Sequence, residues 1–291
     1  MVIGDVMPDG RGPSVRARQL ARELRRLRTE RGLTGEQVSS DLGWSSAKIS
    51  RLEMARTAIT LADLRRLLNR YDAGDSTAER LTELARKARE RGWWETYVDS
   101  FDENYATFIS LEDDATFMHC YHMNVVNGLL QSESYTRAIV TSGGPKPYGE
   151  LERRIQVRLR RQERLRDDDA LNVWAVLDEA TLRRNIGGDE VMHEQLEHLI
   201  EVAETPNVTL QILPYEAGAH SSLPGSFVIF GFQQPDDPRI VALETLVGNL
   251  IIEDDVQVFR HTLTFDELRN KALSPEESLP FISRIAHDYK A

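Results

Sequence analysis

The sequence predicts a protein of mixed, α+β class, in which a compact all-α domain precedes a larger α/β-like domain. The chain has 291 residues, about twice the usual length of one domain. Its first third shows only helical spacing of apolar residues, whereas short β-prone runs alternate with helical stretches after residue 150. The charge is also divided unevenly along the chain, which favours two parts with different partners.

The two parts carry opposite charge. Residues 1–92 contain 19 Lys and Arg against 13 Asp and Glu, and the remaining residues contain 17 against 34. A basic segment joined to an acidic body suggests a module that binds a polyanion on a body that repels it. Charge alone leaves a second reading open, in which the basic helices are simply a solvated surface.

We expect four segments from the apolar pattern. Residues 1–14 form a flexible tail, 15–92 the all-α domain, 93–150 a helical and aromatic connector packed on the second domain, and 151–291 the α/β-like domain. The β-prone runs are 172–177, 208–213, 226–232 and 240–245. The helical stretches between and after them are 151–166, 189–204, 254–272 and 275–289.

Composition excludes several classes of protein. The single cysteine, Cys120, rules out an internal disulfide framework and fits a reducing compartment. No apolar run approaches the roughly 18 residues that a membrane span needs, and the N-terminus lacks the pattern of a signal peptide. We therefore expect a cytoplasmic protein that does not contact a membrane.

The most informative segment runs from Gly35 to Met54. Two helices that cross closely need a small residue in the first helix, a residue at ease with positive φ in the turn, and an apolar anchor in the second helix. Ser39, Gly43 and Ile49 stand at these three places. This spacing predicts a helix-turn-helix, and the alternative is a helical bundle without a DNA role.

Residues 34–53 (TGEQVSSDLGWSSAKISRLE) resemble the λ-repressor-like regulators of the xenobiotic-response-element (XRE) class, with Ser39 where an alanine is more usual. The resemblance implies that the helix from Ser45 to Met54 lies in the DNA major groove. Lys48 and Arg51 should face solvent and contact bases or phosphates, while Ala47 points inward or across the turn. The candidate DNA contacts are Thr34, Gln37, Ser45, Ser46, Lys48 and Arg51. Glu53 should pair with an arginine of the first helix, such as Arg22 or Arg26.

The rest of the chain resembles a C-terminal domain of unknown function found in actinomycete XRE-type regulators. The segments that carry this resemblance are Trp93-Trp94, 128–135 (GLLQSESY), 158–165 (RLRRQERL), 178–182 (DEATL), 208–214 (VTLQILP), 218–220 (GAH) and 225–227 (GSF). Asn127 departs from the proline that usually precedes the Gly-Leu-Leu. The resemblance implies a small acidic partner protein and gives no settled chemistry.

Within the second domain, Glu179, His220 and Glu244 each lie beside an expected strand end, where sites of α/β domains gather. They could bind a ligand or signal, or perform the acid–base chemistry of a phosphoester hydrolase. A histidine that is merely packed and hydrogen-bonded is the alternative. His193 and His198 do not form a metal pair, because five helical steps leave their imidazoles about 140° apart.

We therefore expect a sequence-specific regulator rather than an enzyme, with no cofactor, no metal and no catalytic residues. Motifs for nucleotide binding or a serine nucleophile do not occur. A homodimer on a palindromic operator is expected, because one small helix-turn-helix makes few phosphate contacts. The second domain would dimerise and sense a small-molecule effector or a partner. The competing classes are a DNA-targeted hydrolase and a protein-interaction module.

Overall fold

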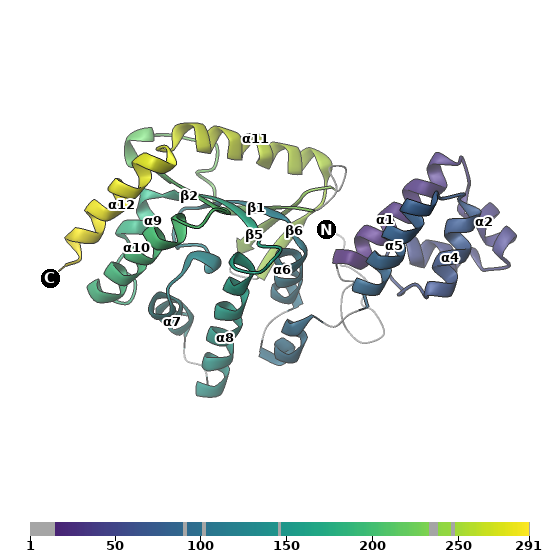
Figure 1. Cartoon of the computed structure of the whole chain (residues 1–291), viewed down its shortest axis with the longest axis horizontal. Coiled ribbons are helices and arrows are strands. Elements are labelled where there is room, and N and C mark those ends of the chain that lie inside the picture. Colours follow the sequence, from purple (N-terminus) through teal and green to yellow (C-terminus); the bar gives the residue numbers. More distant parts are fainter. Residues whose placement is uncertain are drawn as a thin grey trace. The chain divides into compact units, whose positions relative to one another are not determined.

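The computed structural model describes residues 15–89, 92–100, 103–144, 147–232, 238–245 and 248–290, so the expected tail lies outside the described residues. The chain forms two compact units, Met1–Glu95 and Thr96–Ala291. The first unit is helical and the second contains a six-stranded mixed sheet with helices (Figure 1). This arrangement confirms the predicted fold class.

The first unit is built from amphipathic helices around one apolar core. Its helices are α1 (Val15–Glu30), α2 (Gly35–Leu42), α3 (Ser46–Glu53), α4 (Leu61–Arg70) and α5 (Asp75–Lys87). Leu24, Ile49, Leu64 and Leu81, from four different helices, are at most 2% exposed and belong to this core. Helices this short are marginal in isolation, so their mutual packing stabilises them.

The second unit is organised by one mixed sheet. Its strands are β1 (Phe117–His122), β2 (Asn172–Asp178), β3 (Val208–Leu213), β4 (Phe227–Gly231), β5 (Ile240–Thr245) and β6 (Gly248–Ile252). Their order is β3-β2-β1-β4-β5-β6, with β1, β2 and β3 parallel and β4, β5 and β6 added antiparallel. The sheet therefore joins a parallel half to an antiparallel half at β1.

Helices and short 3₁₀ turns fill the rest of the second unit. The α-helices are α6 (Glu103–Asp114), α7 (Glu133–Ser142), α8 (Tyr148–Arg161), α9 (Glu179–Arg183), α10 (Asp189–Ala203), α11 (Asp255–Lys271) and α12 (Pro275–Asp288). The 3₁₀ turns are η1 (Trp93–Ser100), which spans the boundary of the two units, η2 (Gly128–Leu130), η3 (Gln162–Leu165) and η4 (Tyr215–Ala217).

Strand β1 corrects the expected role of residues 93–150. This segment was expected to be a connector packed on the second domain, but it contributes α6, α7 and the strand at the centre of the sheet. The sequence of β1, FMHCYH, lacks the β-branched residues and clean alternation that mark most strands. Its neighbours β2 and β4, rather than its own propensity, decide that it is extended.

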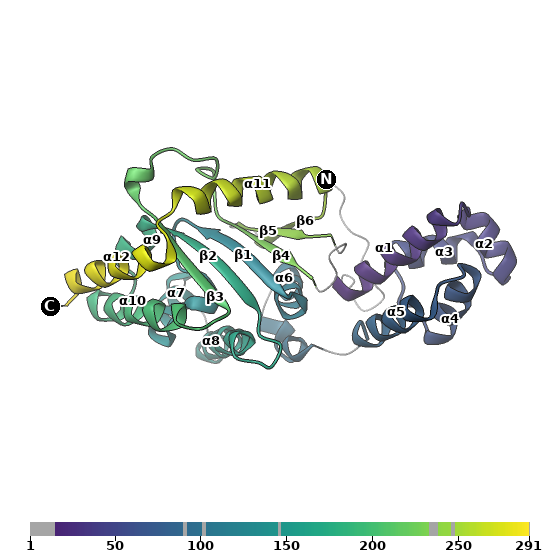
Figure 2. The same cartoon turned by 45° about the horizontal axis from the view of Figure 1, so that its top comes forward.

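The sheet lies between two helical layers. Helix α11 covers one face, where Val258, Phe265 and Leu268 pack against strand residues such as Tyr121 and Ile229. Helices α6, α7, α8 and α10 lie on the other face (Figure 2). Because successive side chains of a strand point to opposite faces, β1 sends alternate residues into these two different layers.

A buried ion pair joins α6 and α8, two helices on the face of the sheet opposite to α11. The Arg161 guanidinium of α8 donates to both carboxylate oxygens of Glu112 of α6, at 2.7 and 2.8 Å, and also to the Tyr105 hydroxyl at 2.8 Å. Arg161 is 4% exposed and Glu112 is 1% exposed. Each charge is therefore out of water and depends on the other for compensation.

Glu112→Ala is expected to lower the free energy of unfolding by about 3–5 kcal/mol, because Arg161 would stay buried without a counter-charge. Urea denaturation followed by circular dichroism measures this loss. Glu150→Ala is the control, since it breaks the i,i+4 pair with Arg154 on the surface of the same helix as Arg161. The control should cost only about 0.3–0.5 kcal/mol, and an equal loss in both variants would contradict the importance of the buried pair.

Candidate functional site

Helices α2 and α3 form a helix-turn-helix whose ends are fixed by local hydrogen bonds. The Thr34 side chain accepts from the Gln37 backbone N–H at 3.1 Å, and the Gln37 side chain accepts from the Thr34 N–H at 2.8 Å. This capping box satisfies donors that the first turn leaves unpaired. Gly43 ends α2 with φ of +65°, a conformation that costs glycine little.

The crossing of the two helices follows the predicted spacing. Ser39 is buried at 6% exposure, and its hydroxyl donates to the Glu36 carbonyl, so the small residue satisfies its own polar group within the helix. Ile49 and Leu52 anchor α3 in the core. Ser45 caps α3 by accepting from the Lys48 backbone N–H at 3.2 Å.

Lys48, which was expected to face solvent, is only partly exposed, at 34% of its side chain, and is held by neighbouring side chains. Its ammonium group lies 2.9 Å from the Asp63 carboxylate of α4 and 3.8 Å from the centre of the Trp44 ring. Burial raises the pKa of Asp63, but its bonds to Lys48 and Thr60 outweigh this effect and lower it overall. Lys48 therefore ties α3 to α4, which the local sequence of α3 could not reveal.

The exposed face of α3 includes residues that sequence reasoning missed. Arg51 is exposed, and its guanidinium has no hydrogen bond or ion pair with any residue that the structure describes. Ala47 was expected to point inward or across the turn but is exposed, and Ser50 was not considered. The exposed face, which we call the α3 outer face, consists of Ser46, Ala47, Ser50, Arg51 and Met54. Residues one helical turn apart share a face, and this spacing could have identified Ser50.

Glu53, the residue after Leu52, holds α3 against the first helix, as the sequence analysis expected. Its partner is Arg28 rather than Arg22 or Arg26, with two hydrogen bonds of 2.6 and 2.9 Å. Arg28 also donates to the Leu33 carbonyl, so one arginine fixes both the turn after α1 and the end of α3. The α3 outer face is thus presented by a rigid scaffold.

In the second unit, His220 belongs to a hydrogen-bonded chain. Its Nδ1 accepts from the Ser222 backbone N–H, so in the neutral ring Nε2 carries the proton and donates to the Tyr121 hydroxyl at 3.3 Å. Tyr121 in turn donates to Asp178 at 3.2 Å. Burial, together with the Asp178 carboxylate, raises the pKa of Tyr121, so its hydroxyl stays protonated at neutral pH.

The other two members of the expected trio lie elsewhere. Glu179 is 5% exposed, pairs with Arg183 and accepts from the Tyr215 backbone N–H. Glu244, on β5, lines a cavity on the face of the sheet opposite to α11. No hydrogen bond or ion pair joins any two of Glu179, His220 and Glu244. Neighbouring residues of β1 explain the separation: Tyr121 faces the α11 layer and His220, whereas His122 faces the cavity.

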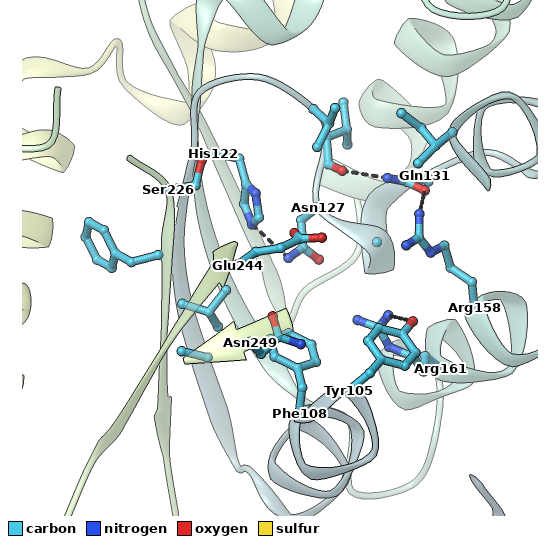
Figure 3. A pocket seen from close by; sticks show the side chains of 17 residues that line it. Tyr105, Phe108, His122, Asn127, Gln131, Arg158, Arg161, Ser226, Glu244 and Asn249 are labelled. Carbon is cyan, nitrogen blue, oxygen red and sulfur yellow. Dashed lines mark hydrogen bonds between the residues drawn. The ribbon is translucent and has the colours of Figure 1, made fainter. Parts of the chain in front are cut away.

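The cavity has a volume of about 70 Å³ and lies between strands β1, β4, β5 and β6, helices α6 and α8, and the segment between β1 and α7 (Figure 3). Its polar lining includes His122, Asn127, Arg158, Glu244 and Asn249. Its aromatic lining includes Tyr105 and Phe108, which lie together in Figure 3. Sequence reasoning identified only Glu244 among these residues.

Two further properties concern only the residues that the structure describes. They contain no cluster of three or more His, Cys, Asp and Glu that could hold a metal ion. Within the described ranges, none of the helices is long and apolar enough to cross a membrane. His193, which the sequence analysis excluded from a metal pair, contacts the Ala286 carbonyl through Nδ1.

His122 makes stability depend on pH. Burial lowers the pKa of His122 to about 4, although the Glu244 carboxylate raises it in part. In the unfolded state the histidine has a pKa near 6.5. As the pH falls below this value, the unfolded state binds a proton and the folded state does not. The stabilisation is complete above pH 6.5 and is lost as the pH falls towards 4.

Between pH 7 and pH 5, His122 should account for a loss on the order of 1–2 kcal/mol in the free energy of unfolding. Urea denaturation at both values measures this loss. In His122→Gln the pH-dependent loss should be smaller, and only partly smaller, because burial also lowers the pKa of His119 to about 4. Equal losses in the wild type and the variant would show that His122 is not held neutral.

Comparison with protein-family models gives two matches that agree with this geometry. A helix-turn-helix domain matches residues 19–81, and a domain of unknown function (DUF5753) matches residues 105–284. Comparisons with curated proteins and with solved structures found no match. The first match covers the helices that present the α3 outer face, and the second covers the whole sheet. The chain carries an XRE-like helix-turn-helix DNA-binding domain and belongs to the DUF5753 family.

Proposed function

We propose that this protein is a cytoplasmic, sequence-specific transcriptional regulator, which places the α3 outer face in the major groove of DNA. The observation that carries the proposal is the exposed Arg51 on a capped helix-turn-helix. A guanidinium without an internal partner is available for a bidentate contact with guanine. Ser46 and Ser50 flank it with hydroxyl groups that fit bases or phosphates.

The other expected DNA contacts take different roles in this proposal. Thr34, Gln37 and Ser45 already serve as helix caps, so they position the two helices and bring backbone N–H groups towards phosphates. Lys48 supports α3 through Asp63 and Trp44. Base discrimination then depends on Arg51, Ser50 and Ser46, with Ala47 and Met54 as apolar neighbours.

We infer that the second unit dimerises through the outward side of α11. Val256, Phe259 and Leu263 are 63%, 62% and 51% exposed and follow one side of this helix, which we call the α11 outer stripe. A helix with apolar residues on both sides is expected to be buried on both, because each apolar side is stabilised by removal from water. An antiparallel arrangement of two copies is the two-fold contact that such a stripe allows. The basic residues at the end of the helix, Arg269 and Lys271, already pair with Asp266 and Glu267, so the apolar stripe carries this inference.

The second unit serves as a sensor in this proposal rather than as an enzyme. The His220 ring N–H donates to the Tyr121 hydroxyl. The Glu179 carboxylate forms an ion pair with Arg183 and accepts from the Tyr215 backbone N–H. These groups support the fold at the positions where a hydrolase would need a free acid and base. The cavity lined by Glu244 is the place for an effector, and a small acidic partner protein is the alternative signal.

Selection of bound duplexes from a randomised pool tests the proposed function. The full chain should select a palindrome with half-sites about 10 bp apart, or a multiple of that spacing. Arg51→Ala should lose about 1–3 kcal/mol of discrimination at one position of each half-site. Arg86→Ala, which removes an exposed arginine on α5, should keep the preference. Selection of no sequence by the wild type, or an unchanged preference in Arg51→Ala, would contradict the proposal.

Phe259→Glu should convert the dimer into a monomer, because it places a carboxylate in the centre of an apolar contact. Sedimentation equilibrium measures the mass, and footprinting on the selected palindrome should show weaker protection. Tyr148→Glu is the matched control, since Tyr148 is 77% exposed at the start of α8 and lies outside the stripe. A Phe259→Glu protein that remains dimeric would exclude the α11 outer stripe as the interface.

A further inference from the structure

Two opposite charges line the cavity of the second unit without neutralising each other. Arg158, from α8, donates to the Gln131 side-chain oxygen at 3.1 Å and forms no ion pair with any described residue. The Glu244 carboxylate, from β5, likewise forms no hydrogen bond or ion pair with the described part of the chain. The two side chains approach from different elements, on opposite sides of the cavity (Figure 3).

The remaining ionisable groups of the lining are already compensated. Arg161 is paired with Glu112. His122 is neutral, because its Nε2 must accept from the Asn127 side-chain amide at 3.0 Å. The orientation of that amide is fixed, since its oxygen accepts from the Leu129 backbone N–H. The cavity therefore presents the partly buried Arg158 and, at its exposed edge, Glu244, neither of which has an ion-pair partner among the described residues.

The size of the cavity limits what can occupy it. A volume of about 70 Å³ is only about twice the ~30 Å³ that one water occupies in the liquid, and about half that of a cavity that holds benzene. The enclosed part therefore holds only a few non-hydrogen atoms, well below a drug-sized site, and the rest of a larger occupant would extend past the exposed Glu244. Tyr105 and Phe108 provide aromatic surface beside Asn249, whose amide has no hydrogen bond with the described residues. The occupant is thus small and polar at two ends.

We propose that this cavity binds a small zwitterion of the α-amino-acid class. The Arg158 guanidinium presents parallel N–H groups that match a carboxylate. Glu244 and the Asn249 side-chain amide oxygen accept from the ammonium group. Tyr105 and Phe108 already carry the Arg161 guanidinium, whose carbon lies 5.6 and 5.2 Å from their ring centres, so these rings shape the cavity and are not assigned to the ammonium. A ligand with a single charge would compensate only one of the two side chains.

The regulatory consequence of this proposal, that an occupied cavity changes DNA binding, rests on the proposed function. Ligand binding itself is independent of DNA. The cavity includes β1, β5 and the segment between β1 and α7, so a bound molecule would tie both halves of the sheet together. Binding to the folded state alone raises its stability by mass action.

Thermal unfolding of the full chain, with and without each standard α-amino acid, tests the proposal. Alanine is compared with propionate and ethylamine, which carry only its carboxylate or only its ammonium group. Titration calorimetry on the strongest stabiliser then gives its affinity for the wild type, Arg158→Met and Glu244→Gln. Arg153→Met is the matched control, because Arg153 is exposed on the same helix and does not line the cavity.

At least one α-amino acid should raise the melting temperature, and its single-charge analogues should not. Arg158→Met and Glu244→Gln should each weaken binding about tenfold or more, and Arg153→Met should leave the affinity unchanged. Absence of any shift, equal shifts with a single-charge analogue, or full affinity in both cavity variants would overturn the proposal. If the protein selects a palindrome but no amino acid raises its melting temperature, only the ligand proposal is wrong. If an amino acid raises the melting temperature but no DNA sequence is selected, only the proposed regulatory function is wrong.

Discussion

The pairing of β1 with both β2 and β4 is the constraint on which the second unit depends. This strand joins the parallel half of the sheet to the antiparallel half. Because its side chains alternate between faces, it also divides the chemistry of the unit. Tyr121 enters the layer of α11 and bonds to His220, while His122 enters the opposite layer and lines the cavity. Two adjacent residues of β1 thus belong to different sites, a packed polar network on one face of the sheet and the cavity on the other.

In the first unit, some charged side chains are bound to other residues of the fold, whereas others have no internal partner in the described part of the chain and can contact a ligand. Lys48 and Arg51 stand three residues apart on one short helix and were expected to act alike. Asp63 engages Lys48, whereas Arg51 has no partner within the described residues. A cation that is already paired with an internal carboxylate is less available to a base, and this contrast is the reason why the proposed base contact falls to Arg51 rather than to Lys48.

Buried charge plays the corresponding role in the second unit. The Arg161–Glu112 pair joins α8 to α6, and the same two helices contribute Arg158 and Phe108 to the cavity. Arg161 is paired with Glu112, whereas Arg158, one helical turn away, is bonded only to the neutral Gln131 side chain. The ion pair fixes α8, the helix that carries Arg158, and Gln131 orients the Arg158 guanidinium at the cavity.

Features that depend on local spacing could be predicted from the sequence. It predicted the two-part organisation, the capping box at Thr34, the turn at Gly43 and four of the six strands, because helix periodicity, caps and β-prone runs act over a few residues. The role of β1, the partner of Lys48 and the positions of Glu179, His220 and Glu244 became visible only in the folded chain. Each of these depends on segments far apart in the chain, such as α4 beside α3 or β5 two strands from β1. Strand pairing and burial compete with local preference at such positions, and the long-range contacts prevail.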